Sequence, residues 1–180
     1  MAEFFDALSD EHQRFIERKH VFFVATAAAD GRVNLSPKGG PSVVPLGPDR
    51  LLWLNLTGSG NETAAHVLAQ NRITLMWTAF EGRPLILRVY GNARAIHPDE
   101  PGWDECVARI PAHVGARQYF EIAVESVQTS CGYQTPLMDY REERKALEKW
   151  AEKKGDDGLR TYWSEKNAVS IDGLSTRRDG

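Results

Sequence analysis

The chain has 180 residues, of which 42% are hydrophobic and 26% charged, and its formal net charge is −3. This size and composition are typical of one globular domain, so we expect a single domain over residues 1–180. The slight acidity excludes a nucleic-acid footprint, and with no signal-peptide pattern or membrane-spanning apolar run we predict a cytoplasmic protein without a membrane partner.

Taken in chain order, the sequence begins with a short helix inside residues 1–19, for which Ser9 is a suitable N-cap. Strands and inserted helices then fill residues 20–130, and Asp30-Gly31 is a strong turn signal within the first hairpin. The expected order is two strands within 21–37, strands 42–46 and 51–56, a helix 62–70, strands 72–80 and 84–96, a helix 103–109 and a strand 118–127. Successive hairpins favour a mainly β protein, an antiparallel barrel with inserted helices, over a parallel sheet.

The C-terminal part is expected to hold one helix and a tail. Asp139 and Glu142 have capping-box spacing, which predicts a helix over 137–155 that ends at Gly155. The tail, residues 156–180, contains apolar side chains without helical or strand alternation. Such a segment is too apolar to stay disordered, so it should pack on its own barrel or on a partner subunit.

A glycine-rich loop, "GSGNET", follows the strand 51–56 and opens a predicted helix. Backbone N–H groups at the start of a helix attract anions, so a phosphate is the expected ligand. A dinucleotide fingerprint fits poorly, because Thr63 stands where the third glycine belongs and a second βαβ unit does not follow.

Strand alternation in "VNLSPKGG" places Ser36 and Lys38 on one face together with Asn34. A hydroxyl and an ammonium two residues apart can form half of a phosphate cradle, with the glycine-rich loop as the other half. The alternative is that Lys38 is a solvated turn residue and Ser36 an edge hydroxyl.

The long strand 84–96 places Arg88 and Tyr90 on one polar face, and Trp77 lies on its partner strand. A flat aromatic cofactor could lie along this surface, with Arg88 stabilising negative charge on its ring. The alternative is ordinary cross-strand pairing on an exposed or subunit-facing surface.

Other candidate chemistry is weak. Cys131 could be a nucleophile, but a small buried residue at a strand end is the favoured interpretation. The five histidines show no ligand spacing, so no metal site is expected.

Three segments, "FFVATAAADGRVNLSPKG", "GSGNETAAHVL" and "LRVYGNARAI", resemble the pyridoxamine 5′-phosphate oxidase-like family of FMN-binding split barrels. "SCGYQTPLM" and "YWSEKNAVSIDGL" are similar to a bacterial subgroup of that family. The resemblance implies a split β-barrel and a homodimer with FMN at its interface. It also implies FMN contacts, with Trp77 and Arg88 near the ring and the phosphate held by Ser36, Lys38, Ser59, Asn61 and Thr63.

The resemblance implies an FMN-dependent oxidoreductase that moves hydride or electrons between FMN and a small organic or nicotinamide substrate. The ending "SIDGLSTRRDG" replaces the "RLxP" type of ending with which genuine pyridoxamine 5′-phosphate oxidases bind substrate, so that activity is not expected. The alternative is a non-catalytic carrier or sensor of flavin, deazaflavin or haem. The residues identify no catalytic acid or base, and Glu62 would repel a phosphate unless its carboxylate points away.

Overall fold

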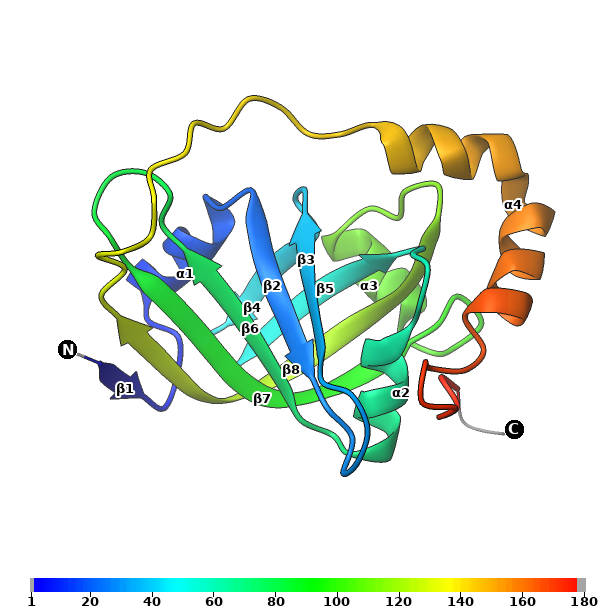
Figure 1. Ribbon diagram of the computed structural model, residues 1–180, viewed down its shortest axis with the longest axis horizontal. Coiled ribbons are helices and arrows are strands. Elements are labelled where there is room, and N and C mark those ends of the chain that lie inside the picture. The colour runs from blue at the N-terminus through cyan, green and yellow to red at the C-terminus, as the bar shows by residue number, and fades with distance from the viewer. Residues whose placement is uncertain (1, 178–180) are drawn as a thin grey trace.

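Eight antiparallel strands organise the computed structural model, which describes residues 2–177 (Figure 1). Seven pair in the order β3-β2-β6-β7-β8-β5-β4, and β1 pairs with β8 beside this path. The strands are β1 (Glu3–Phe5), β2 (Val21–Thr26), β3 (Asn34–Gly39), β4 (Val43–Gly47), β5 (Arg50–Leu56), β6 (Ile73–Thr78), β7 (Ile86–Ile96) and β8 (Ala116–Ser130). The helices are α1 (Asp10–Glu17), α2 (Glu62–Ala69), α3 (Trp103–Arg109) and α4 (Ala146–Lys166).

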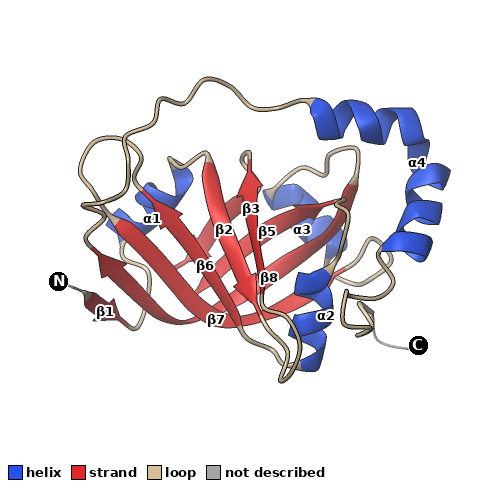
Figure 2. Cartoon of the chain, in the orientation of Figure 1, coloured by secondary structure: helices blue, strands red, loops and turns tan. Residues whose placement is uncertain are grey.

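The sheet curls strongly, so that β2, β3 and β6 pass over β4 and β5 while the helices stay at the margins (Figure 2). The mainly β, split-barrel prediction is therefore confirmed. The expected hairpins all form; the short strand β1 was not predicted. Its three residues are too few to show a clear alternation.

The core lies inside the curl and is rich in aromatic side chains. Phe22 stacks on Trp77 with ring centroids 5.6 Å apart, and Trp53 stacks on Phe120 at 4.9 Å. Strand β5 is buried on both faces, because its alternate residues face this core and a second cluster under α3. The glycine-rich loop therefore begins from a strand fixed on both sides.

A bulge bends the long β7–β8 pair. The register shifts between Tyr90 and Gly91, and a Cβ at Gly91 would lie 2.0 Å from the carbonyl oxygen of Ala123. Only glycine allows the two backbones to approach this closely.

The C-terminal helix differs from the prediction. Residues 139–145 are not helical: the Tyr140 ring stacks on His20 at 3.6 Å, and the Tyr140 hydroxyl donates to Glu143 at 3.1 Å. The stacking contact ties Tyr140 to the barrel, while the Tyr140–Glu143 bond lies within the exposed segment. The helix begins only at Ala146, so the capping-box pattern is not used. Gly155 does interrupt α4, with φ 65°, but a second helical stretch follows it at once and runs to Lys166.

The segment after Gly155 packs on its own barrel, which is one of the two expected arrangements. Leu159 is buried, and the Trp163 indole N–H donates to the Thr57 hydroxyl at 2.8 Å. A long connection crosses from β8 to α4 (Figure 1). Cys131 lies at its start and is exposed, so the expected burial of this thiol is wrong.

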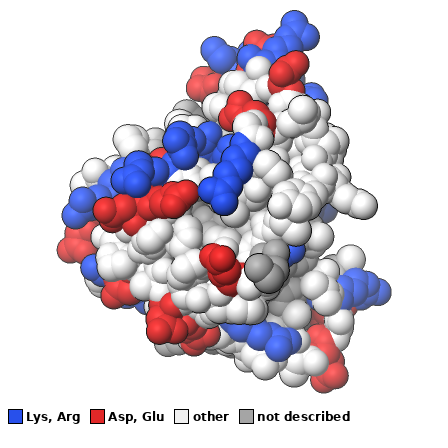
Figure 3. Space-filling view, turned by 90° about the vertical axis from the view of Figure 1, so that its left-hand side faces the viewer, with Lys and Arg blue, Asp and Glu red and all other residues white. Residues whose placement is uncertain are grey.

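On the face seen in Figure 3, acidic and basic side chains are mixed around the margin, and the middle of the face carries few charges. Among residues 2–177, none of the helices combines the length and apolar character needed to cross a membrane.

Candidate functional site

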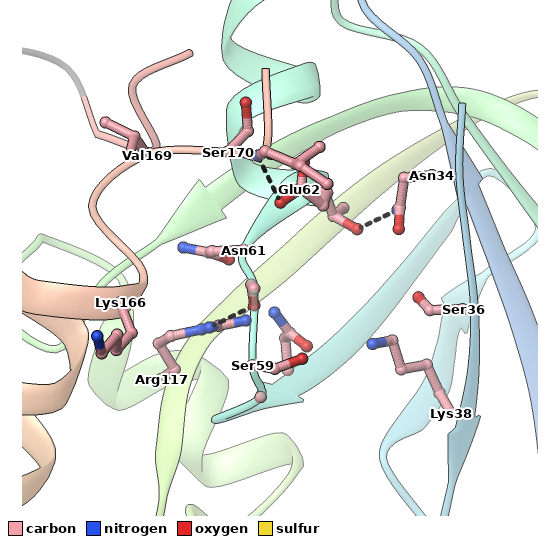
Figure 4. Close-up of a pocket in the computed structure, with 15 residues that line it drawn as sticks. Asn34, Ser36, Lys38, Ser59, Asn61, Glu62, Arg117, Lys166, Val169 and Ser170 are labelled. Carbon is pink, nitrogen blue, oxygen red and sulfur yellow. Dashed lines mark hydrogen bonds between the residues drawn. The ribbon is translucent and has the colours of Figure 1, made fainter. Parts of the chain in front are cut away.

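A polar pocket of about 520 Å³ lies between β3, the loop 58–63 and the end of the chain after α4 (Figure 4). Strand β3 supplies one wall, since its side chains alternate between half-buried and exposed. The lining residues are Asn34, Ser36, Lys38, Asn55, Gly58, Ser59, Gly60, Asn61, Glu62, Thr63, Arg117, Lys166, Val169, Ser170 and Ile171.

The loop 58–63 presents its backbone N–H groups without internal partners. Within the described residues, none of these six N–H groups donates a hydrogen bond. The Asn61 side chain does not cap α2, because it exchanges hydrogen bonds with the side-chain amide of Gln118, at 2.8 and 3.4 Å. Gly58 and Ser59 are exposed, while Asn61 and Thr63 are buried. Free N–H groups at the N-terminus of a helix are suited to an anionic acceptor.

Arg117, on β8, is a buried cation beneath the loop and is only 5% exposed. Its Nη1 donates to the Gly60 carbonyl at 2.9 Å and to Asn167 Oδ1 at 2.6 Å. Its Nε is buried and has no partner among the described residues. Burial lowers the pKa of Arg117 to about 10. A buried guanidinium with an unused donor is suited to a charged acceptor.

Lys38 approaches the same pocket from β3, and its Nζ lies 5.5 Å from the centroid of the Trp53 ring. Burial, and then repulsion from Arg117, lower the pKa of Lys38 to about 8. Neither cation forms an ion pair with a carboxylate in the described part of the chain. One buried and one half-buried cation without a counter-ion make the pocket attractive to an anion.

A polar network joins the two walls. The Asn34 Nδ2 donates to the hydroxyls of Thr63 and Thr26, at 3.1 Å each, and the Thr26 hydroxyl lies 3.1 Å from His66 Nδ1. Because Thr63 and His66 belong to α2 while Asn34 belongs to β3, this network fixes the distance between the walls.

Glu62 points away from the cradle toward the chain end, as the labelled side chains in Figure 4 show. Its two carboxylate oxygens accept from the backbone N–H of Ile171, at 3.1 and 3.2 Å. The carboxylate that would repel a phosphate is thus occupied by another donor.

The structure brings five of the predicted site residues together around the pocket: Ser36, Lys38, Ser59, Asn61 and Thr63. It does not bring the other two there. Trp77 is 0% exposed inside the core, because strand alternation turns it inward. Arg88 lies on the opposite face of the neighbouring strand, where its Nη1 donates to the Ser130 hydroxyl at 3.2 Å.

Sequence reasoning missed Arg117, Lys166 and the residues after α4 that line the pocket. The position of Arg117 follows from the pairing of β5 with β8, in which Asn55 lies opposite Gln118. That pairing joins strands distant in sequence, and no local pattern indicates it. The available signal was local: Arg117 comes directly before the strand residues Gln118, Tyr119 and Phe120, which are fully buried.

Comparisons with known proteins agree with this architecture. Residues 8–131 match the family model described as pyridoxamine 5′-phosphate oxidase. The chain is 33% identical over 192 residues to the pyridoxamine 5′-phosphate oxidase family protein ustO of Aspergillus flavus, an alignment covering 97% of this chain and 77% of that protein.

Two solved structures share the fold. A candidate pyridoxamine 5′-phosphate oxidase from Lactobacillus delbrueckii has a TM-score of 0.54 and 21% identity, covering 68% of this chain and 94% of that one. The haem storage protein HutZ from Vibrio cholerae has a TM-score of 0.51 and 16% identity, covering 71% and 98%. The family model and the fungal relative together establish that this chain belongs to the pyridoxamine 5′-phosphate oxidase family.

Proposed function

We propose that the pocket binds the phosphate of FMN and that the protein is an FMN-dependent oxidoreductase. The observation that carries this proposal is the set of N–H groups in the loop 58–63 that lack a partner among the described residues. The loop lines a pocket that also holds the half-buried Lys38 and the buried Arg117. A phosphate would supply the acceptors and the negative charge that this arrangement lacks.

Bound FMN would supply hydride or electron transfer through its ring, to or from a small organic or nicotinamide substrate. The residues of the pocket would hold and orient the cofactor. Its one carboxylate, Glu62, is engaged by the Ile171 N–H, so the pocket offers no evident acid or base for a substrate. Deazaflavin cofactors that end in a phosphate would meet the same cradle.

A non-catalytic carrier on the same barrel is the second candidate, and the fold shared with the haem storage protein HutZ makes haem the ligand to test. Haem iron in proteins is commonly held by a histidine or cysteine. The lining contains neither residue type, which favours FMN over haem at this position.

We also propose a homodimer whose interface borders the cofactor. Large apolar side chains are exposed near the pocket. Val33, next to β3, is 74% exposed, and Leu35, on the face of β3 opposite Ser36 and Lys38, is 67% exposed. Ile171, which lines the pocket, is 69% exposed. β3 is an edge strand, and exposed apolar residues around an open edge are typical of a protein contact. Sedimentation of the parent and of Leu35→Glu tests the contact: the parent should be dimeric and the variant monomeric, whereas a monomeric parent contradicts the proposal.

Absorption spectroscopy and calorimetric titration of the purified protein test the cofactor. We expect binding of FMN at micromolar concentrations, in preference to haem. Reduced nicotinamide should bleach the bound flavin, and air should restore its colour. Preference for haem, or no FMN binding, would overturn the FMN proposal, while FMN binding without bleaching by any donor would favour the carrier.

A further inference from the structure

The residues that follow α4, 167–172, cross the pocket, and we name them the C-terminal strap. Asn167 anchors one end and is buried. Its Oδ1 accepts from Arg117 Nη1 at 2.6 Å, and its Nδ2 donates to the Gly58 carbonyl at 3.1 Å. One side chain thus joins the strap, the buried guanidinium and the glycine-rich loop.

Asp172 anchors the other end on the turn before β3. It pairs with the Arg32 guanidinium and accepts from the Arg32 backbone N–H at 2.7 Å. Gly31, with φ 92°, makes room for this contact, because a Cβ there would lie 2.6 Å from Asp172 Oδ2. Between the two anchors, the Ile171 N–H donates to the Glu62 carboxylate.

The strap also supports its own shape. The Ser170 N–H donates to the Leu174 carbonyl at 2.8 Å, and the Thr176 hydroxyl donates to the Asn167 carbonyl at 2.8 Å. Ser170 and Thr176 are both buried. These bonds fold the residues after the strap back onto it, so the strap is a built element of the pocket.

We propose that the C-terminal strap is a wall of the phosphate site that selects a terminal phosphomonoester over a phosphodiester, and that Asn167 is a positioning residue that aims Arg117 at the phosphate. This inference rests on the proposed FMN function and assigns its specificity to particular residues.

The geometry supports both parts of the inference. In Figure 4 the side chains of Ser36 and Lys38 enter from one side, while Lys166 and Val169 lie on the opposite side of the loop. A phosphate bound at the loop 58–63 would lie between β3 and the strap. In a dinucleotide such as FAD the chain continues from the phosphate to a second nucleotide, and that second part would collide with the strap. Arg117 has a hydrogen-bond acceptor, Asn167 Oδ1, that fixes its Nη1 and leaves its Nε unpaired among the described residues.

Two variants test the two roles separately: the positioning of Arg117 by Asn167, and the exclusion of larger ligands by the strap. Asn167→Asp places a carboxylate against Arg117 and competes with the ligand for its charge. Asp172→Lys sets like charge against Arg32 and should release the strap. Asp156→Lys on exposed α4 is the matched control, because it makes the same charge change and Asp156 does not line the pocket. Calorimetry with FMN, riboflavin and FAD gives the dissociation constants.

For Asn167→Asp we expect FMN affinity to fall by about tenfold or more, because the new carboxylate neutralises Arg117 and weakens its charge-assisted bond to the phosphate. Riboflavin affinity should be unchanged. For Asp172→Lys we expect the preference for FMN over FAD to shrink. The control should behave as the parent. Equal losses for FMN and riboflavin overturn the positioning role, and an unchanged FMN-to-FAD ratio overturns the wall.

Inorganic phosphate separates failure of this inference from failure of the proposed function. If the parent binds phosphate but not FMN, the FMN proposal fails. The positioning role of Asn167 is then tested by whether Asn167→Asp weakens the binding of inorganic phosphate. The role of the strap as a wall is tested by whether Asp172→Lys strengthens the binding of dimethyl phosphate relative to inorganic phosphate. If the parent binds neither FMN nor phosphate, both proposals are wrong.

Discussion

Replacing Lys38 by methionine should stabilise the ligand-free protein while weakening FMN binding. Burial, and then Arg117, lower the pKa of Lys38 from 10.5 to about 8, which corresponds to roughly 3 kcal/mol against its charged form. The lost contact with the Trp53 ring offsets roughly 0.5–2 kcal/mol of that gain. A net gain of roughly 1–2.5 kcal/mol should raise the Tm by about 2–4 °C per kcal/mol.

The sign of the pH dependence follows from the lowered pKa of Lys38 in the folded protein. Below about pH 8 the folded protein carries the unfavourable charge in full. Between pH 8 and 10.5 the folded protein binds fewer protons than the unfolded chain at this group, so the unfavourable contribution disappears as the pH rises. Thermal denaturation without FMN should therefore show the advantage of Lys38→Met at pH 7 and little advantage near pH 10.

The same substitution removes a charged donor from the proposed phosphate site. Loss of a hydrogen bond to a charged group is worth roughly 1.5–3 kcal/mol, so the FMN Kd should rise about ten- to 150-fold. Lys153→Met is the matched control, since Lys153 is exposed on α4. A lower Tm at pH 7 together with an unchanged FMN affinity would refute the reasoning.

Three further substitutions test the surrounding structure. Gly91→Ala should lower the free energy of unfolding in urea by several kcal/mol, because its Cβ would lie 2.0 Å from the Ala123 carbonyl. Tyr119→Phe should cost roughly 1–3 kcal/mol in the same assay, because the buried hydroxyl donates to the Ile110 carbonyl at 2.5 Å. Arg88→Ala should change FMN affinity by no more than about twofold, the usual range for a change outside a site; a tenfold loss would return Arg88 to the site.

The strands were predictable because their signals are local. Alternation and turn residues such as Asp30-Gly31 predicted the hairpins, and alternation in β3 correctly turned Ser36 and Lys38 inward. The misplaced start of α4 has a different cause. The Asp139 capping pattern competes with a stacking contact between Tyr140 and His20, which lie 120 positions apart and cannot be paired by inspection.

The candidate site was predictable only where its residues follow one another in the sequence. The glycine-rich loop is a continuous segment, so the proposal that it binds an anion could be drawn from its residues alone. Arg117 and Asn167 reach the loop only through the β5–β8 pairing and the return of the chain after α4. Trp77 shows the opposite error, since its aromatic character suggested a cofactor although its place in the alternation made it a core residue.

The amide protons of residues 58–63 provide the most direct test that this loop is the FMN phosphate site. A ¹H–¹⁵N spectrum of the labelled protein would be recorded free, with FMN and with riboflavin. With FMN, the amides of the loop should shift downfield and exchange more slowly, because each unpaired N–H near the phosphate gains an acceptor. Riboflavin should leave them nearly unchanged. Loop amides that stay in place while FMN binds elsewhere would contradict the account.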